Sequence, residues 1–482
     1  MSTSFLLAIA CGNSDHPAGP VDSGAAGNGA GGSTNDAAVS DAAMAGETSV
    51  PTSFQGFFPQ TGAASACSDP PLRLSFNGPP TLGSSGKIQL WDASQPSTPV
   101  ASLDMSMMNV MSTIGGLVFT LPRPVYVDGN DVIAYLHSGS LGFGKTLYVT
   151  IDAGAITGPD GAAMSIADAN TWHFTTKAAA PADPAAISVA LDGSADFCSV
   201  QGAVDAVPNG NTAPTTISIA AGTYREVVHF RAKNNVTLHG QDRKGTVIAG
   251  INNNALNPNT TSRSLIGIDN SSGIVVENMT MQNLTPPNAS QSETLRLQAC
   301  DQCVVRDADI IGNQDTLLWE GRIYANNCYI AGNVDFVWGR GTVYFNNCEI
   351  KTVSRTGYNV QARNGSATYG YVFVDSKLTA DTGITGDYLA RIDVSSYPGS
   401  HVAYINCQMG SHIIPAGWLV IGAAAPDAST SALRFWEYQS VDPNGMPIDV
   451  SQRIASSLQL SADQAALMRD PTVVLAGWQP PQ

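Results

Sequence analysis

The chain has 482 residues, only 13% of them charged, and a formal net charge of -16 at pH 7. This acidic balance argues against nucleic acid and against an anionic membrane surface as partners, because both would repel it. The length suffices for two or three domains, and the many small and polar residues favour an all-β, exported protein over a helical cytosolic one.

The N-terminus carries the features of an export signal. Residues 1–11 contain a short apolar run that ends at Cys11, and residues 12–51 are rich in Gly, Ala and Ser. Such a tract buries no core, so we expect a disordered tether. The combination resembles a bacterial lipoprotein signal, although the run is short and no Lys or Arg precedes it. We therefore expect a secreted or cell-surface protein with Cys11 as the site of a lipid anchor, for instance to the outer membrane; an apolar N-terminus without targeting meaning is the alternative.

Residues 52–177 are expected to form a separate β domain. Segments such as Leu72–Phe76 alternate apolar and polar residues and are bounded by Gly and Pro, which predicts strands with one buried face. The spacing suits an immunoglobulin-like sandwich of about seven strands, and the close around Trp172 resembles modules appended to bacterial surface enzymes. We find no catalytic constellation in it, so a spacer is the favoured role and carbohydrate contact the alternative. Residues 178–186, rich in Ala and Pro, form a semi-rigid linker.

Residues 187–482 consist of short strand-like segments, and part of this sequence repeats every 20 residues. Asp315 and Asp335 follow this step, as do Ile310, Ile330 and Ile350. A repeat of this length, rich in β-branched residues and Asn, predicts a parallel β-helix. Equivalent positions of neighbouring coils lie about 4.8 Å apart, so the two aspartates should face each other.

Helical segments are expected near both ends of the β-helix. Residues 199–207 carry apolar residues at helical spacing, and this helix should cap the N-terminal edge. A second helical stretch, about Ser451–Met468, should pack along the outside or cover the other end.

Two cysteines also follow the repeat. Cys328 and Cys348 occupy matching positions, and the strand spacing falls inside the Cα range that a disulfide needs, so they are a disulfide candidate. A ladder of two free, buried thiols is the alternative. The pair Cys300 and Cys303 has no second pair at zinc-site spacing, so no metal site is predicted.

Carboxylates are the expected source of chemistry. Two of them at coil spacing cannot both ionise easily, so the pKa of one rises. A neutral acid beside an ionised carboxylate can run acid–base or nucleophilic chemistry. The sequence has no G-x-S-x-G motif, and its seven His residues form no metal-like cluster.

Residues 312–318 (Gly-Asn-Gln-Asp-Thr-Leu-Leu) and 333–339 (Asn-Val-Asp-Phe-Val-Trp-Gly) resemble the two signature blocks of pectin methylesterases. Further blocks agree in order and spacing, at 192–197, 221–226, 291–296, 361–363, 389–391, 415–418 and 435–438. The resemblance covers about 187–478. It implies a right-handed parallel β-helix that demethylates homogalacturonan to pectate and methanol, with methyl-esterified homogalacturonan as partner, no metal or cofactor, and a monomer.

The resemblance also implies roles for single residues. Asp335 is the nucleophile that attacks the ester carbonyl. Asp315 protonates the leaving methanol and later accepts a proton from water. Gln314 and Gln291 donate hydrogen bonds to the oxyanion. Arg391 holds Asp335 ionised, because a neighbouring cation lowers the pKa of a carboxyl group, or it meets a substrate carboxylate.

Four further residues are substrate-binding candidates. Phe336, Trp338 and Tyr358 are expected in the floor or wall of a sugar cleft, although internal stacking is an alternative for Phe336. Arg363 is either a binding residue or a structural surface residue.

The sequence departs from the family pattern at two places. Asp393 stands where the family has a Trp after its Arg, and Ser292-Glu293 replaces Ala-Val. These changes affect the expected substrate preference more than the reaction type. Two other hypotheses therefore stay open: a related surface lipoprotein esterase or thioesterase for a non-pectin substrate, and a non-catalytic carbohydrate-binding β-helix.

Overall fold

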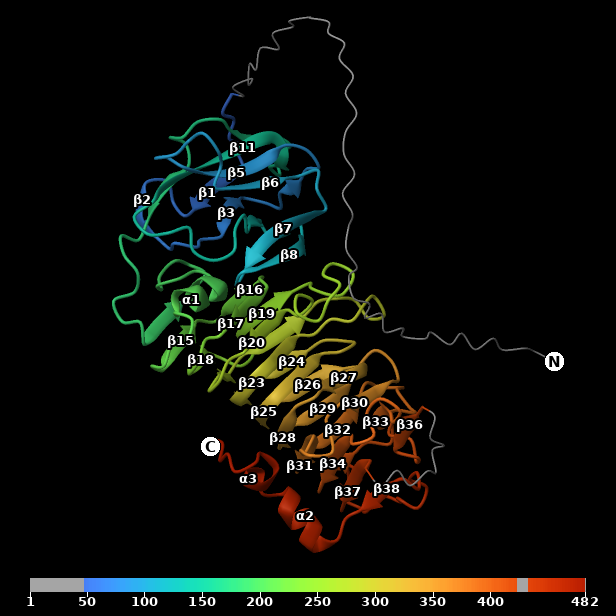
Figure 1. Ribbon diagram of the computed structural model, residues 1–482. Helices are drawn as coiled ribbons and strands as arrows, with labels where there is room; N and C mark the ends of the chain where they lie inside the picture. The colour runs from blue at the N-terminus through green and yellow to red at the C-terminus, as the bar shows by residue number, and fades with distance from the viewer. Residues whose placement is uncertain (1–46, 423–431, 482) are drawn as a thin grey trace, which may run out of the picture. The chain divides into compact units, whose positions relative to one another are not determined.

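The computed structural model describes residues 47–422 and 432–481 (Figure 1). The predicted signal, Cys11 and most of the tether 12–51 lie outside the described residues. Within the described part, none of the helices has the length and apolar character needed to cross a bilayer. The described chain is a β-sandwich followed by a parallel β-helix.

The sandwich is built from two main sheets and a hairpin. One sheet has the order β1-β3-β10-β9, the other runs β2-β13-β11-β5-β6 with β4 and β12 on β11, and β7 pairs with β8. Inward-facing residues such as Leu74, Val149 and Trp172 are fully buried between the sheets. The strands are more numerous than the roughly seven predicted, and several have only two to four residues. Their bounds are β1 Phe54–Phe58, β2 Ala63–Ala66, β3 Leu72–Phe76, β4 Thr81–Leu82, β5 Lys87–Asp92, β6 Ala101–Asp104, β7 Asn109–Ile114, β8 Leu117–Pro122, β9 Val125–Asp128, β10 Asp131–Ala134, β11 Thr146–Thr157, β12 Ala163–Ile166 and β13 His173–Thr176.

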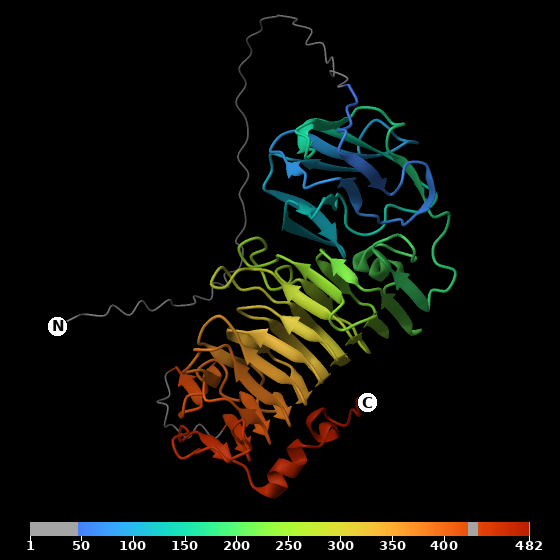
Figure 2. The same cartoon turned by 180° about the vertical axis from the view of Figure 1, so that it is seen from behind.

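The β-helix consists of three parallel ladders (Figures 1 and 2). The long strands β23 and β25 belong to the first and second ladders at once, because each turns a corner without ending. The first ladder is β14 Ala186–Val189, β15 Thr215–Ile219, β18 Val236–Gly240, β21 Val275–Glu277, β23 Leu295–Arg306, β25 Leu317–Asn326, β28 Thr342–Asn346, β31 Tyr371–Val374, β34 His401–Ile405, β37 Arg434–Tyr438 and β38 Ser457–Gln459. The second is β17 Val228–Arg231, β20 Ile266–Asp269, β23, β25, β27 Val334–Gly339, β30 Tyr358–Ala362, β33 Tyr388–Asp393 and β36 Trp418–Ile421. The third is β16 Gly222–Tyr224, β19 Thr246–Gly250, β22 Thr280–Asn283, β24 Asp309–Ile311, β26 Tyr329–Gly332, β29 Glu349–Thr352, β32 Lys377–Ala380 and β35 Gln408–Met409.

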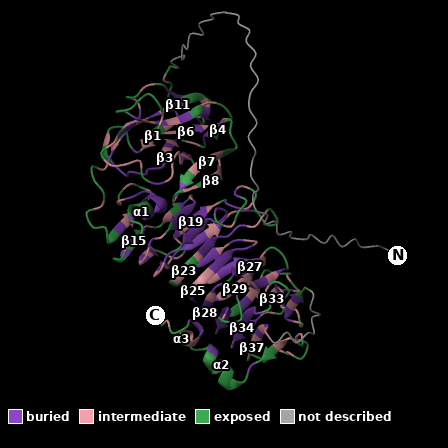
Figure 3. Cartoon of the chain, viewed as in Figure 1, coloured by how far each residue is buried: buried purple, intermediate pink, exposed green. Residues whose placement is uncertain are grey.

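The register explains the 20-residue repeat. Ile310 pairs with Ile330, which pairs with Ile350, and all three side chains are fully buried in the core. Figure 3 shows buried residues along the strands of the β-helix. The corner residues Asp307 and Asn327 of the same repeat have φ angles of 51° and 52°. Asp and Asn tolerate this left-handed conformation better than other non-glycine residues, which accounts for their place in the repeat.

The disulfide candidate from sequence is wrong. Cys328 and Cys348 lie in register but are free, buried thiols, so the alternative interpretation holds. Equivalent side chains of a parallel ladder point the same way, and each thiol donates to a carbonyl oxygen of its own coil: Cys328 Sγ to Asn326 O at 3.4 Å and Cys348 Sγ to Asn346 O at 3.3 Å. The disulfide in the described part joins Cys67 of the sandwich to Cys198 at the start of the β-helix.

One of the two predicted helices is placed correctly. Helix α1, Val200–Ala206, begins after Ser199, whose Oγ accepts from Gly202 N at 3.0 Å, and it packs against β14 and β17. The second prediction began too early, because β38 extends the first ladder before the chain turns helical. Helix α2 is Ala462–Met468, opened by a capping box at Ser461, and α3 is Pro471–Val474. Both pack along the outside of the first ladder, as predicted, in a cluster with the Tyr344 ring.

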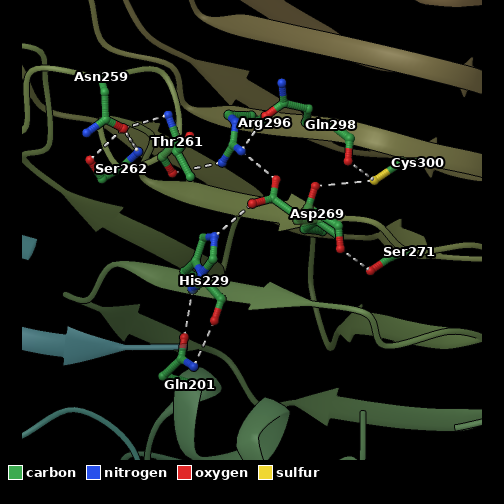
Figure 4. Close-up of polar contacts among 11 residues, drawn as sticks. Gln201, His229, Asn259, Thr261, Ser262, Asp269, Ser271, Arg296, Gln298 and Cys300 are labelled. Atoms are coloured by element: carbon green, nitrogen blue, oxygen red, sulfur yellow. Dashed lines mark hydrogen bonds and ion pairs between the residues drawn. The ribbon is translucent and has the colours of Figure 1, made fainter. Parts of the chain in front are cut away.

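A polar network lies on the outward side of the second ladder at its N-terminal end (Figure 4). Asp269 Oδ1 forms an ion pair with Arg296 Nη2 at 2.6 Å, and Asp269 Oδ2 pairs with His229 Nε2 at 3.1 Å. Gln201 of α1 joins through Nε2, which donates to His229 O at 3.0 Å. Gly267, between these side chains, leaves the space they need, because a Cβ there would lie 2.8 Å from the His229 ring. We name Gln201, His229, Asp269 and Arg296 the internal network.

Candidate active site

The two predicted aspartates lie on neighbouring coils, at the corner where the third ladder passes into the second. Asp315 precedes β25 and Asp335 lies at the start of β27, and Asp315 N donates to Val334 O at 3.0 Å. Their φ angles are 64° and 49°, a region that costs free energy for a residue with a side chain. Strain of this kind persists where the surroundings impose it, and it commonly marks a functional site.

Arg391 and Gln361 hold the Asp335 carboxylate from β33 and β30. Arg391 Nε donates to Asp335 Oδ1 at 2.9 Å, and its Nη2 also contacts Oδ2. Gln361 Nε2 donates to Oδ2 at 3.1 Å, and Gln361 Oε1 accepts from Arg363 Nε at 2.6 Å. Burial raises the pKa of Asp335, while the hydrogen bond and charge of Arg391, and then the charge of Arg363, lower it. Arg391 thus acts in the expected direction, but burial outweighs it.

Asp315 has a different set of charged neighbours. Burial raises the pKa of this carboxyl well above its usual value; the charge of Glu293 adds to the rise, Arg263 opposes it, and Asp335 adds to it again. Arg263 Nη2 donates to Asp315 Oδ2 at 3.0 Å. Two carboxylates face Asp315, whereas Asp335 is paired with Arg391, so these contacts favour the neutral form at Asp315 and the ionised form at Asp335.

The two glutamines lie beside the pair on adjacent coils. Ser292 N donates to Gln314 O at 3.1 Å, so the segments that carry Gln291 and Gln314 lie side by side on adjacent coils. Both are half-buried. Their position next to the carboxylate pair suits amide donors aimed at a developing oxyanion.

The four substrate-binding candidates lie in different environments in the structure. Phe336 is fully buried in the β-helix core, so its assignment to the cleft is wrong. The left-handed backbone at Asp335 disturbs strand alternation, and Phe336 turns inward, where Gly332 leaves room for it. Trp338 is 7% exposed, with the guanidinium of Arg363 over its ring at 4.6 Å.

Tyr358 is half-buried at the site itself. The Arg391 guanidinium lies 4.6 Å from its ring centroid, and the ring stacks on Tyr388 at 5.6 Å. Asp393, two residues beyond Arg391 on β33, accepts from Ser395 N at 2.9 Å. No described hydrogen bond or ion pair joins the Asp393 side chain to Asp335 or Arg391.

Sequence reasoning missed three polar residues of the site. Gln361 lies in one of the blocks that resemble the family, but the sequence assigned it no role. Glu293 was identified only as a departure from the family pattern. Nothing in the sequence indicates that Glu293 is buried or that its partner is Arg263, 30 residues upstream. The loop between β19 and β20 brings it there.

The arrangement can perform covalent catalysis on an ester. It places Asp335, which is fixed by the Arg391 guanidinium, next to Asp315, whose pKa is raised well above its usual value, with Gln291 and Gln314 on adjacent coils. These surroundings favour a charged nucleophile at Asp335 and a neutral general acid at Asp315.

Comparisons with known proteins agree on one family. The family model described as Pectinesterase matches residues 186–467. The chain is 32% identical to "Pectinesterase 31" of Arabidopsis thaliana over 291 residues, which are 58% of this chain and 89% of that protein. It is 30% identical to "Pectinesterase 4" of the same plant over 53% of this chain and 45% of that protein. Among solved structures, the pectin methylesterase from carrot has a TM-score of 0.53 at 24% identity, covering 62% of this chain and 95% of that one, and the Aspergillus niger enzyme has a TM-score of 0.53 at 23% identity, covering 62% and 96%. The structural likeness shows that the β-helix fold is shared.

Proposed function

Because the chain belongs to the pectinesterase family, we propose that it hydrolyses the methyl esters of homogalacturonan, releasing methanol and leaving free carboxylates on the polymer. The single observation that carries the proposal is the pairing of Asp315, whose pKa is raised well above its usual value, with Asp335, which is held by Arg391. Neighbouring coils supply the acid and the nucleophile in one register.

The reaction proceeds through an acyl-enzyme. An Asp335 carboxylate oxygen attacks the ester carbonyl, and the amides of Gln291 and Gln314 donate to the resulting oxyanion. Asp315 gives its proton to the departing methoxide, so methanol leaves and an anhydride links substrate and enzyme. Water then attacks the substrate carbonyl while the Asp315 carboxylate accepts a proton. Asp335 departs as a carboxylate, and both side chains return to their starting states.

The location of the protein is also part of the proposal. A secreted or cell-surface enzyme suits a polymeric substrate, and the Cys67–Cys198 disulfide supports export because disulfides persist in oxidising compartments. Cys11 is the proposed lipid anchor, and the sandwich is the proposed spacer between anchor and catalytic domain.

A second candidate function is hydrolysis of a non-pectin ester on the same carboxylate pair. Asp393 favours it, because a carboxylate near Arg391 repels a chain that already carries free carboxylates. The test is whether simple aryl esters are cleaved when methylated pectin is not.

Methanol release from highly methylated pectin tests the proposal. Wild type should release methanol, Asp335→Asn should not, and Asp381→Asn, on an exposed turn, is the matched control that should behave as wild type. If wild type leaves both pectin and aryl esters intact, the esterase proposal is wrong, and retained polysaccharide binding would then indicate a non-catalytic β-helix.

A further inference from the structure

Glu293 and Arg263 form a buried ion pair in contact with the proposed acid. Glu293 is 0% exposed, and the Arg263 side chain is 9% exposed. Arg263 Nε donates to Glu293 Oε2 at 2.9 Å and its Nη2 donates to Oε1 at 2.6 Å. The same Nη2 donates to Asp315 Oδ2 at 3.0 Å. One guanidinium nitrogen therefore bridges the two carboxyl groups.

The position of Arg263 is fixed from a third side as well. Its Nη1 donates to Asn254 Oδ1 at 3.3 Å, and Asn254 N donates to Gln291 O at 2.9 Å. The guanidinium lies 5.8 Å from the Trp338 ring centroid. The Arg263–Glu293 ion pair thus contacts the proposed acid Asp315 and is linked through Asn254 to the backbone of Gln291, a proposed oxyanion residue.

A lone guanidinium at this distance would oppose the function of Asp315. A cation within hydrogen-bond reach favours the ionised form of a carboxyl group, and an ionised Asp315 cannot protonate a leaving methoxide. A carboxylate that pairs with the same guanidinium cancels most of this effect, while the hydrogen bond to Asp315 stays and continues to orient it.

We propose that Glu293 is a positioning residue: through Arg263 it keeps the proton on Asp315 and fixes the direction in which that proton is delivered. This inference rests on the proposed esterase function. A buried ion pair that serves stability alone is the competing explanation, and the two differ in what they do to the pH dependence of catalysis.

Four charged groups face Asp315, and together they define the expected signs. Glu293 and Arg263 approach from the segments before β23 and β20, Asp335 from β27, and Arg363 from the end of β30. Glu293 and Asp335 raise the pKa of Asp315, and Arg263 and Arg363 lower it. Removing the charge of Glu293 should lower the pKa of Asp315, because two arginines then face it with one carboxylate. Removing the charge of Arg263 should raise the pKa of Asp315, because two carboxylates then face it with one arginine.

The test is the pH profile of kcat for methanol release in a cycle of three variants. Glu293→Gln should move the alkaline limb to lower pH by about one to three units, because the unopposed Arg263 favours ionised Asp315. Arg263→Gln should move the same limb to higher pH. The double variant removes both charges, so its limb should return close to that of wild type while kcat at the optimum falls, because the carboxyl group is no longer oriented.

A limb that stays in place in all three folded variants, with only stability or overall kcat changed, overturns the inference and leaves a structural ion pair. A limb that moves in the same direction in both single variants overturns it too. If one single variant does not fold, the other carries the test. A shift of the predicted sign in the folded single variant, with the limb near that of wild type in Glu293→Asp, which keeps the charge, supports the inference. An unmoved limb in the folded single variant overturns it.

A second readout does not depend on turnover. Infrared titration of protonated carboxyl groups, with Asp315→Asn used to assign the Asp315 band, should show deprotonation at lower pH in Glu293→Gln than in wild type. An unchanged titration overturns the inference even if wild type proves inactive on pectin. Absent methanol release from wild type together with a shifted titration would instead refute the proposed substrate and leave the role of Glu293 intact.

Discussion

One outward-facing row of the second ladder connects residues of the internal network with residues of the candidate active site. The in-register pairs run from His229 through Gly267 to Arg296, then to Leu318, Trp338 and Gln361. At the first end, Asp269 is 6% exposed; at the other, Asp335 is 5% and Asp315 is 8% exposed. Burial alone therefore does not separate a structural carboxylate from a catalytic one.

The two groups differ in charge balance and in what covers them. Asp269 is one carboxylate between a guanidinium and an imidazole, whereas Asp315 faces two other carboxylates. Hairpin strand β8 covers the internal network: Thr120 N donates to Asn257 Oδ1 at 2.8 Å, and Phe119 of the same strand lies against His229. Arg391, at the other end, keeps 28% of its side chain exposed. Carboxylates that lie close together raise one another's pKa. Where a substrate can reach such a group, the raised pKa can serve acid–base chemistry.

The largest expected effect is on kcat, which should respond very differently to substitutions in the candidate active site and in the internal network. Asp335→Asn removes the nucleophile and should lower kcat by roughly 10⁴-fold or more. Asp269→Asn should leave kcat per folded molecule within about threefold, because the network touches no proposed reacting atom. Methanol release normalised to the folded fraction measures both. A comparable loss in Asp269→Asn would mean that the network belongs to the catalytic machinery.

Stability should show the reverse order. Asp269→Asn leaves the buried Arg296 guanidinium without its carboxylate, and removing one partner of a buried pair costs about 3–5 kcal/mol. Urea unfolding at pH 7 measures the change, with Asp381→Asn as the exposed control. A cost below about 1 kcal/mol would show that the network does not need its charge.

Asp315 should itself reduce stability above acidic pH. Its folded-state pKa is raised above the ordinary value of 3.8, so its contribution to stability is complete below that pH and is lost as the pH rises through the folded-state pKa. Asp315→Asn should therefore match wild type near pH 4 and exceed it at higher pH, by about 1.4 kcal/mol for each unit of the rise. Urea midpoints across pH measure this. Equal midpoints at every pH would contradict the raised pKa.

The smallest effect concerns Gln361. Gln361→Leu removes one hydrogen bond to the Asp335 carboxylate, so the pKa of Asp335 should rise and the acidic limb of kcat should move to higher pH. The loss of kcat at neutral pH should be about tenfold, which corresponds to one charge-assisted hydrogen bond. The pH profile of methanol release measures it. An unmoved acidic limb would show that Arg391 alone sets the charge state.

Much of the fold could be predicted because the β-helix repeats locally. The step between Ile310 and Ile330 and the left-handed corners at Asp307 and Asn327 are readable from residue types alone. The segment before Met468 was mistaken for helix, because strand β38 forms only by pairing with the preceding coil. Cys328 and Cys348 follow the repeat, but the repeat does not specify whether two neighbouring thiols bond, and in the structure both are free and buried.

The sequence by itself determined the register of Asp315 and Asp335, since residues 20 apart on a regular solenoid must lie on neighbouring coils, and the resemblance supplied the roles of nucleophile and acid that we propose for them. Only the tertiary structure decided which groups set their protonation. Arg263 and Glu293 come together through a loop between strands, and Phe336 turned inward because the left-handed Asp335 shifts strand alternation. Charge interactions and burial depend on distances in space, and outside the repeating coils these distances do not follow from spacing along the chain.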